Sequence, residues 1–263
     1  MALTNQTVLI TGASGGIGLD LAELFAKAGY HLVLVARSVD KLKTEAERLS
    51  AAHGIQAHVL PADLSVPHAA KEVVAQLQER GLTIDVLVNN AGHGTYGPFA
   101  QADLDREIGM IELNVTALTE LTGLLLPGMV ERRRGRILNV ASTAAFQPGP
   151  LMAVYYASKA FVLSFSEAIA NELEGTGVTV TCLCPGPTQT GFQAGAKMEK
   201  SKLFQSLPVM SSKEVARAGF EALMAGKTLE VPGLLNKLSA QSPRLAPRGL
   251  VVRIVRRMQA ASH

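Results

Sequence analysis

The 263-residue sequence predicts an α/β fold in three layers, with helices on both faces of a mostly parallel sheet of about seven strands and a C-terminal helical tail. Two observations support this prediction. Short apolar runs alternate with amphipathic helical patterns along most of the chain, and the runs are apolar throughout, as in strands buried on both faces. The chain is also 48% hydrophobic and 18% charged, a composition that suits a doubly covered sheet.

The strand and helix patterns alternate from the N-terminal residues onward. Strands are expected at residues 7–10, 31–37, 56–60, 84–88, 136–140 and 178–184. Helices are expected after the glycine-rich turn at residues 11–18, after Arg37, and at residues 67–80, 103–132 and 152–174. Because the sequence contains no repeat, low-complexity tract or linker, we expect a single domain over residues 1–263.

Composition and charge argue against several classes of protein. A net charge of +3 is too small to indicate a nucleic-acid-binding protein. Cys182 and Cys184 lie two residues apart in a predicted strand, so they point the same way and cannot easily form a disulfide. No metal-binding set is expected. No apolar run reaches the roughly 20 residues of a membrane span, and residues 1–12 lack a signal-peptide pattern, so we expect a cytoplasmic protein.

The glycine-rich turn TGASGGIG lies between the first predicted strand and the first predicted helix. Gly12 permits a tight exit from the strand, Gly16 lets the backbone approach a pyrophosphate, and Gly18 lets helix and strand pack closely. The phosphates would then lie at the N–H groups and positive dipole end of the helix. A flexible turn is the alternative, but the position at the first strand–helix junction favours a dinucleotide-binding site.

The end of the second predicted strand indicates which dinucleotide is preferred. An acidic residue there would accept a hydrogen bond from a ribose 2′-hydroxyl, whereas an arginine would pair with a 2′-phosphate. The sequence continues Val35-Ala36-Arg37-Ser38 and has no acid at this point. Together with Ser14 in the glycine turn, Arg37 favours NADP(H), although NAD(H) is possible. A solvated surface arginine is the alternative interpretation.

A candidate proton-transfer pair follows the fifth predicted strand. Tyr155 and Lys159 are four residues apart on a predicted helix and therefore share a face. An ammonium group beside a phenol favours the phenolate and lowers the pKa of the phenol toward neutrality. Ser142, at the end of the strand, would hold the oxygen that gains or loses the proton. An ordinary packed tyrosine beside a solvated lysine is the alternative.

Taken together, these residues resemble the classical short-chain dehydrogenases/reductases over about residues 5–190. The resemblance is carried by the glycine turn, by Asp63-Leu64, Asn89-Asn90-Ala91-Gly92, Asn114, Ser142, Tyr155, Lys159 and Pro185-Gly186, in this order. The resemblance implies a three-layer, doubly wound Rossmann fold that binds NAD(P). It also implies hydride transfer between the nicotinamide and a carbonyl or secondary alcohol.

The resemblance implies roles for individual residues. Ser142 would orient the substrate oxygen, Tyr155 would be the general acid and base, and Lys159 would bind the nicotinamide ribose and lower the pKa of Tyr155. Asn114 would support a water molecule that connects Lys159 to solvent. The implied cofactor-binding residues are Gly12, Ser14, Gly16, Ile17, Gly18, Arg37, Asp63, Leu64, Asn90, Ala91, Gly92, Tyr155, Lys159, Pro185, Gly186, Thr188 and Thr190.

The pattern becomes less informative after Gly191, where the substrate would bind. Residues 192–210 alternate apolar with polar residues and lysines, so residues 187–215 are predicted to form a lid over an apolar substrate. An ordinary surface helix is an equally good interpretation. Four apolar residues could line the same pocket, namely Tyr96, Phe99, Phe146 and Met152. We therefore expect a lipophilic ketone or alcohol.

The C-terminal extension, about residues 234–263, departs from the family pattern. Five arginines alternate with aliphatic residues between Pro243 and Met258. Such a basic amphipathic helix could contact an anionic membrane. We favour packing of its apolar face on its own domain or on a partner subunit, and we expect a homodimer or homotetramer.

The sequence as a whole predicts an NADP(H)-dependent oxidoreductase that acts on a small-molecule carbonyl or alcohol. Two alternatives remain. A related isomerase or dehydratase is less favoured, because such proteins usually have a longer substrate domain and a differently spaced glycine turn. A nucleotide-sensing protein without catalytic activity would not need Ser142, Tyr155 and Lys159 together.

Overall fold

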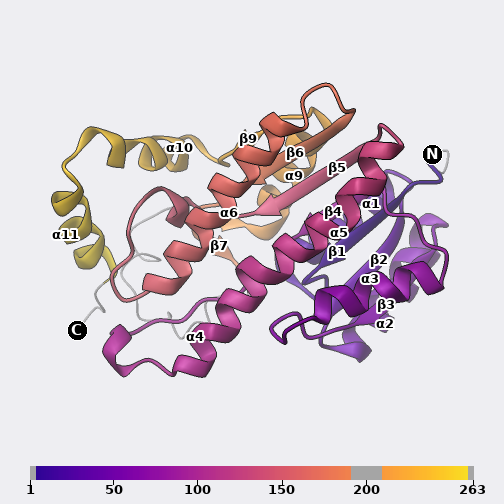
Figure 1. Ribbon diagram of the computed structural model, residues 1–263, viewed down its shortest axis with the longest axis horizontal. Helices are drawn as coiled ribbons and strands as arrows, with labels where there is room; N and C mark the ends of the chain where they lie inside the picture. Colours follow the sequence, from indigo (N-terminus) through magenta and orange to yellow (C-terminus); the bar gives the residue numbers. More distant parts are fainter. Residues whose placement is uncertain (1–3, 191–208, 260–263) are drawn as a thin grey trace.

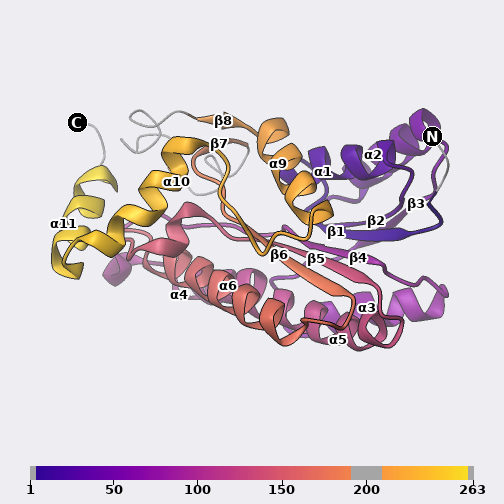
Figure 2. The same cartoon turned by 90° about the horizontal axis from the view of Figure 1, so that it is seen from above.

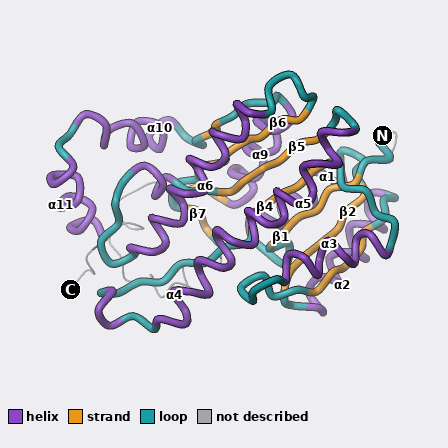
Figure 3. The backbone as a smooth tube through the Cα atoms, viewed as in Figure 1, coloured by secondary structure: helices purple, strands orange, loops and turns teal. Residues whose placement is uncertain are grey.

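The computed structural model describes residues 4–190 and 209–259. Seven parallel strands form one sheet in the order β3-β2-β1-β4-β5-β6-β9 (Figures 1 and 3). Their bounds are β1 Thr7–Thr11, β2 His31–Ala36, β3 Ala57–Pro61, β4 Val86–Asn89, β5 Gly135–Val140, β6 Val178–Leu183 and β9 Leu229–Glu230. The predicted parallel α/β fold is therefore confirmed. A second, two-stranded sheet pairs β7 (Thr188–Gln189) with β8 (Met210–Ser211).

Helices cover both faces of the large sheet (Figure 2). On one face lie α1 (Gly16–Lys27), α2 (Val39–His53) and α9 (Ser212–Met224). On the other face lie α3 (Ala69–Glu79), α5 (Ala117–Glu131) and α6 (Ala153–Glu172). Alternate residues of one strand serve the two cores, because successive side chains point to opposite faces. Val8 and Ile10 pack under α1, whereas Leu9 packs in the other core.

The predicted helix at residues 103–132 is one continuous helical stretch with an irregular centre. It consists of α4 (Leu104–Ile111), a π-helical segment (Glu112–Thr116) and α5. A π turn inserts one residue into the helix and often occurs at functional sites. Here it contains Asn114, one of the predicted site residues, which is 2% exposed.

The same stretch is the one described helix that is long and apolar enough to cross a membrane. Residues Leu104–Glu131 contain an 18-residue window with a mean hydropathy of 1.3, and 33% of that window is buried. Length and hydropathy are weak evidence on their own, because core helices pass the same test. In this chain Leu121 and Met129 pack in the core beneath the sheet. The expectation that no segment spans a membrane stays a prediction.

The C-terminal extension is helical, as predicted. It contains α10 (Leu234–Gln241), a short 3₁₀ turn (Ser242–Leu245) and α11 (Arg248–Gln259). Both helices lie at one end of the molecule, beyond the carboxyl ends of the strands (Figures 1 and 2). Val251 and Val255 of α11 pack against Met152 and Tyr156 at the start of α6. The tail therefore packs on its own domain, as favoured.

Candidate active site

A cavity of about 830 Å³ opens along the carboxyl ends of the strands. It is lined by residues that directly follow β1, β2, β3, β4, β5 and β6, and by residues of the C-terminal extension. Open α/β sheets bind ligands at this edge because the helix N-termini and strand-end loops meet there. The site residues predicted from sequence line this cavity, apart from Gly18 and Asn114.

The glycine turn has the geometry that its sequence predicts. Gly12 has a φ of +67°, and a Cβ atom there would lie 2.8 Å from the Nδ2 atom of Asn90. A Cβ atom on Gly18 would lie 2.4 Å from the carbonyl oxygen of Gly12, so Gly18 allows α1 to pack on β1 and does not line the cavity. The N-terminus of α1 has no side-chain cap, and Gly16 and Ile17 line the cavity beside it. The backbone N–H groups of such a first helical turn point toward the cavity end of the helix and suit an anionic phosphate.

Asn90 holds this turn in place. Its side-chain Nδ2 atom donates hydrogen bonds to the carbonyl oxygens of Thr11, at 2.8 Å, and Gly12, at 3.3 Å. The hydroxyl of Thr11 in turn accepts hydrogen bonds from the backbone N–H groups of Asn90 and Ala91. The strand-end motif after β4 therefore has a structural role in addition to lining the cavity.

Charged residues gather at the end of the cavity next to β2 and β3. Arg37 lies 3.9 Å from a carboxylate oxygen of Asp63, and the Arg37 side chain is 76% exposed. Burial acts to raise the pKa of Asp63, but hydrogen bonds from Ser65 and the charge of Arg37 prevail and hold it below its ordinary value. Lys41, in the first turn of α2, lines the same end and was missed from sequence. The available signal was a second basic residue in the first turn of the helix that follows Arg37.

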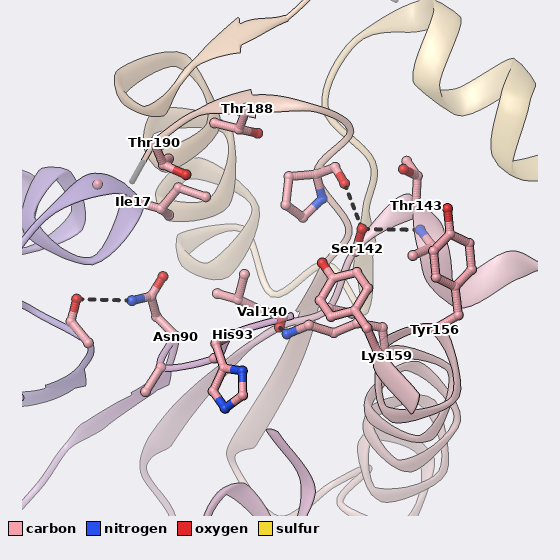
Figure 4. A pocket seen from close by; sticks show the side chains of 18 of the residues that line it. Ile17, Asn90, His93, Val140, Ser142, Thr143, Tyr156, Lys159, Thr188 and Thr190 are labelled. Atoms are coloured by element: carbon pink, nitrogen blue, oxygen red, sulfur yellow. Dashed lines mark hydrogen bonds between the residues drawn. The ribbon is translucent and has the colours of Figure 1, made fainter. Parts of the chain in front are cut away.

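Ser142, Tyr155 and Lys159 meet in the middle of the cavity. Ser142 follows β5 and begins a 3₁₀ turn, where its hydroxyl accepts a hydrogen bond from the backbone N–H of Ala144 (Figure 4). The Ser142 hydroxyl is also hydrogen-bonded to the phenol of Tyr155. Lys159 donates a hydrogen bond of 2.8 Å to the carbonyl oxygen of Val140, and its Nζ atom lies 5.9 Å from the centre of the Tyr155 ring.

The pKa values of this pair differ from the expectation based on sequence. Burial raises the pKa of Tyr155 well above its ordinary value, and the hydrogen bond with Ser142 opposes this only in part. Burial also lowers the pKa of Lys159 to about 8, although nearby Cys182 and Cys184 act to raise it. The expected lowering of the Tyr155 pKa is therefore not found in the chain alone, because desolvation by burial is the largest effect on the phenol.

Asn114 lies behind the pair and not in the cavity wall. Its amide joins two segments, since Oδ1 accepts from the backbone N–H of His93 and Nδ2 donates to the His93 carbonyl oxygen. The same Nδ2 atom donates to the hydroxyl of Ser158, and that hydroxyl donates to the carbonyl oxygen of Tyr155. A Cβ atom on Gly92 would lie 3.0 Å from Asn114 and 3.4 Å from Lys159. A side chain at position 92 would therefore press against both Asn114 and Lys159.

The loop after β6 completes the polar side of the cavity. The Pro185 carbonyl oxygen accepts hydrogen bonds from the backbone N–H of Thr143 and from the hydroxyl of Ser142. Thr188 and Thr190 face the cavity across from Asn90 (Figure 4). A Cβ atom on Gly16 would lie 3.3 Å from the Thr190 side chain, so the loop approaches the glycine turn closely. The sequence placed this loop correctly at the cavity.

The apolar side of the cavity comes from the C-terminal extension, which the sequence did not assign to the pocket. The contributing residues of α11 are Val251, Ile254, Val255 and Met258. The end of α11 is held by Gln259, which is fully buried and donates a hydrogen bond to the hydroxyl of Tyr156. An amphipathic pattern identifies a helix and its apolar face, but not the surface on which that face packs.

Three of the four residues predicted to line the substrate pocket do not line it. Phe99 is 60% exposed on the surface. Phe146 is partly buried against the core cluster that contains Cys182, and Tyr96 donates a hydrogen bond to the carbonyl oxygen of Gln259. Only Met152 lines the cavity. The predicted lid at residues 187–215 falls mostly outside the described residues.

Two further features of the described residues bear on chemistry. His93 lines the cavity, and burial together with the charge of Arg106 lowers its pKa. Cys182 and Cys184 are free and buried with their sulfur atoms 3.8 Å apart, on one face of β6 as expected. Within residues 4–190 and 209–259, no group of three or more His, Cys, Asp or Glu residues could hold a metal ion.

Comparisons with known proteins agree with this geometry. Residues 6–201 match the family model described as short chain dehydrogenase. The ketoacyl reductase HetN of Nostoc sp. is 39% identical over 230 residues, which cover 87% of this chain and 78% of that protein. A very-long-chain 3-oxoacyl-CoA reductase of Aspergillus clavatus is 36% identical over 174 residues, covering 65% of this chain. The aligned part is only 50% of that reductase.

A solved structure extends the likeness to the whole fold. The short-chain dehydrogenase from Sphingobium yanoikuyae in complex with NADPH superposes with a TM-score of 0.82 at 35% identity. The alignment covers 98% of this chain and 99% of that one, so it includes the C-terminal extension. The chain therefore belongs to the short chain dehydrogenase family, a family of oxidoreductases.

Proposed function

We propose that this protein is an NADP(H)-dependent reductase of lipophilic ketones, with Tyr155 as the general acid. The observation that carries the proposal is the meeting of Ser142, Tyr155 and Lys159 in a cavity that also contains an uncapped helix N-terminus. Ser142, Tyr155 and Lys159 can donate and accept a proton, and the helix N-terminus can bind a phosphate. One cavity that offers both suits a hydride-transfer enzyme.

The cavity fits a nicotinamide dinucleotide along its polar side. Backbone N–H groups at the start of α1 would hold the pyrophosphate, and Lys159 would hold the nicotinamide ribose. Arg37 and Lys41 place two positive charges near the end of β2, where a 2′-phosphate would lie, and this supports NADPH over NADH. When bound, the cofactor supplies a hydride to the carbonyl carbon.

Tyr155 would donate its phenolic proton to the carbonyl oxygen as that oxygen gains negative charge. Because burial raises the pKa of Tyr155, the phenol keeps its proton until such an oxygen lies beside it. The hydroxyl of Ser142 would hydrogen-bond to the same oxygen. Lys159, whose pKa is about 8, remains mostly protonated near neutrality and would stabilise the phenolate that is left. Asn114 would hold the water through which Tyr155 regains a proton.

The substrate would bind against the tail. Val251, Val255 and Met258 give the cavity an apolar side next to Tyr155, which suits an alkyl chain or ring system better than a polyol. Two relatives are named for reduction of ketoacyl compounds, whose chains are apolar. We therefore propose a carbonyl group carried on a long or bulky apolar skeleton.

A substrate panel tests this proposal. NADPH consumption would be followed by absorbance with medium-chain and long-chain ketones, cyclic ketones, and short hydroxylated carbonyls of matched reactivity. We expect the highest kcat/KM for the apolar ketones, and a higher kcat/KM with NADPH than with NADH. A preference for the hydroxylated carbonyls would contradict the substrate class, and a preference for NADH would contradict the cofactor assignment.

A further inference from the structure

We propose that the C-terminal extension docks the protein on an anionic lipid surface, with the mouth of the cavity facing the lipid. The part of the extension that carries this inference is α10, the 3₁₀ turn and α11, here called the tail face. Four observations support it. They are charge, exposed apolar residues, the position of the two helices, and one residue shared with the cavity.

Charge is distributed unevenly along the chain. Residues 231–263 contain six lysines and arginines and no aspartate or glutamate. The whole chain has 25 basic and 22 acidic residues, so residues 1–230 have 19 basic and 22 acidic residues. The tail is thus strongly basic on a body of opposite net charge. Such an asymmetry indicates an anionic partner. The six residues are Lys237, Arg244, Arg248, Arg253, Arg256 and Arg257.

Leucines on α10 are exposed on the side away from the protein. Leu234 is 74% exposed and Leu238, one helical turn later, is 60% exposed. The opposite side of the helix is buried through Asn236 and Ala240. Leu245, in the following turn, is 90% exposed. Single exposed leucines are ordinary, but several on consecutive elements indicate an interaction surface.

Helix α11 has a second exposed stripe besides its buried face. Val251 and Val255 face the protein, and the residues one position before each of them face outward. The outward stripe consists of Leu250, Arg253, Ile254 and Arg257. Packing of the helix on its own domain therefore leaves aliphatic residues beside arginines. This combination is typical of helices that lie in a membrane interface.

The tail face lies at one end of the molecule, and Figures 1 and 2 show α10 and α11 there beyond the sheet. Both helices therefore present exposed residues at the same end of the molecule. The exposed leucines of the tail face favour binding to a partner with an apolar interior and not to a nucleic acid. The arginines of the same face favour binding to an anionic surface. A second copy that presents the same face would bring the arginines of one tail against those of the other. Anionic lipid is the partner that satisfies both features.

Ile254 connects the tail face to the cavity. Its side chain is 45% exposed on the outer surface of α11 and also lines the cavity. The neighbouring Met258 lines the cavity too and is half-buried. The rim of the cavity therefore belongs to the surface that would touch the lipid. An apolar molecule dissolved in the lipid could enter the cavity without crossing water.

Vesicle co-sedimentation of the full-length protein tests the proposal. The probes are vesicles of phosphatidylcholine alone and of phosphatidylcholine mixed with an equal part of phosphatidylglycerol. Each basic residue beside an anionic surface strengthens binding by roughly fivefold. We expect binding to the mixed vesicles that weakens as salt is raised, and much weaker binding to phosphatidylcholine alone.

Two matched charge reversals locate the contact. Arg253→Glu/Arg257→Glu changes two arginines four residues apart on the outward stripe of α11. The control Lys213→Glu/Arg217→Glu makes the same change of net charge on exposed residues of α9. The first variant should bind mixed vesicles at least about tenfold more weakly than the wild type. The control should bind within about threefold of it. Equal weakening by both variants, or no binding by the wild type, would overturn the proposal.

A fluorescence probe covers the case in which the charge variant fails to fold. The chain has no tryptophan, so a single Leu250→Trp or Leu235→Trp substitution gives an unambiguous signal. We expect a blue shift of either tryptophan with mixed vesicles and none for Val66→Trp, an exposed position before α3. Unshifted emission from both tail positions, with concentration-dependent self-association that Leu235→Ser/Leu238→Ser abolishes, would assign the face to a second copy and refute the lipid proposal.

Discussion

The polar and apolar sides of the cavity are built in different ways. The polar side consists of short loops that directly follow buried parallel strands, and each loop is fixed by hydrogen bonds such as those from Asn90 to the glycine turn. The apolar side is one face of α11, a helix that reaches the site from the end of the chain. The first arrangement fixes atoms for chemistry. Under the proposed function, the second would select the substrate without moving the residues that transfer the proton.

The largest effect on activity should come from a residue on the polar side of the cavity, when the phenolic oxygen of Tyr155 is removed. Tyr155→Phe should lower kcat by about 100-fold to 10,000-fold, because the proposed general acid, the phenol that is hydrogen-bonded to the Ser142 hydroxyl, is lost. NADPH affinity should change little. Stopped-flow reduction of a good ketone gives the rate. Tyr30→Phe, which removes a buried hydroxyl remote from the site, is the matched control and should retain full activity.

The next prediction concerns the burial of a charge beside Tyr155. Lys159→Met should abolish activity and should also raise the free energy of unfolding near neutral pH. The folded-state pKa of Lys159 is about 8 and the ordinary value is 10.5. Below about pH 8 the amine is charged in both states, so folding bears the full burial penalty of about 3 kcal/mol.

That penalty should disappear in a defined pH range. From about pH 8 to about pH 10.5 the folded state is neutral while the unfolded state is still charged, so wild-type stability rises relative to the variant. Denaturant unfolding of both proteins at about pH 7 and about pH 10 measures the difference. A difference in stability that stays constant over this range would show that Lys159 has an ordinary pKa.

The sequence was most informative where chemistry depends on local backbone geometry. Gly12, Asn90 and Ser142 come at or just after the carboxyl ends of predicted parallel strands. The order of strands and helices was therefore enough to predict that they lie at the same edge of the sheet. The failures have a common cause. Phe99 and Phe146 were assigned to the pocket because they are apolar, but composition does not tell which surface a side chain faces. The pKa of Tyr155 depends on burial from several elements, and the spacing to Lys159 reports only one neighbour.

A smaller effect is expected at the outer end of the polar side. Arg37→Ala/Lys41→Ala should weaken NADPH binding by about 10-fold to 100-fold, because charge-assisted hydrogen bonds to a phosphate are lost. NADH binding should stay within about threefold, as it has no 2′-phosphate. Isothermal titration with each cofactor measures both. Lys43→Ala, exposed on the same helix but outside the cavity, serves as the control. Equal weakening for the two cofactors would refute NADP(H) selection by this pair.

The smallest effect should come from the attachment of the apolar side. Gln259→Met keeps the volume, loses the hydrogen bond to Tyr156 and removes the buried Oε1 atom, which has no hydrogen-bond partner within residues 4–190 and 209–259. Loss of the hydrogen bond destabilises the fold, and removal of a buried oxygen that has no partner among the described residues stabilises it, so we expect Tm to fall by no more than about 2–4 °C. Differential scanning calorimetry measures this. Gln241→Met, at an exposed position of the tail, should leave Tm unchanged. A drop well beyond this range would mean that the tail stabilises the whole fold.

One measurement tests the division of labour between the two sides most directly. The measured quantity is kcat/KM for a long-chain ketone divided by kcat/KM for a short ketone. It is compared among Tyr155→Phe, Val255→Ala and the control Val252→Ala. Val255 lines the cavity, whereas Val252 on the same helix does not. We predict that Val255→Ala lowers the ratio about tenfold, while Tyr155→Phe lowers both constants and leaves the ratio unchanged. A ratio altered by Tyr155→Phe and unaffected by Val255→Ala would contradict the account.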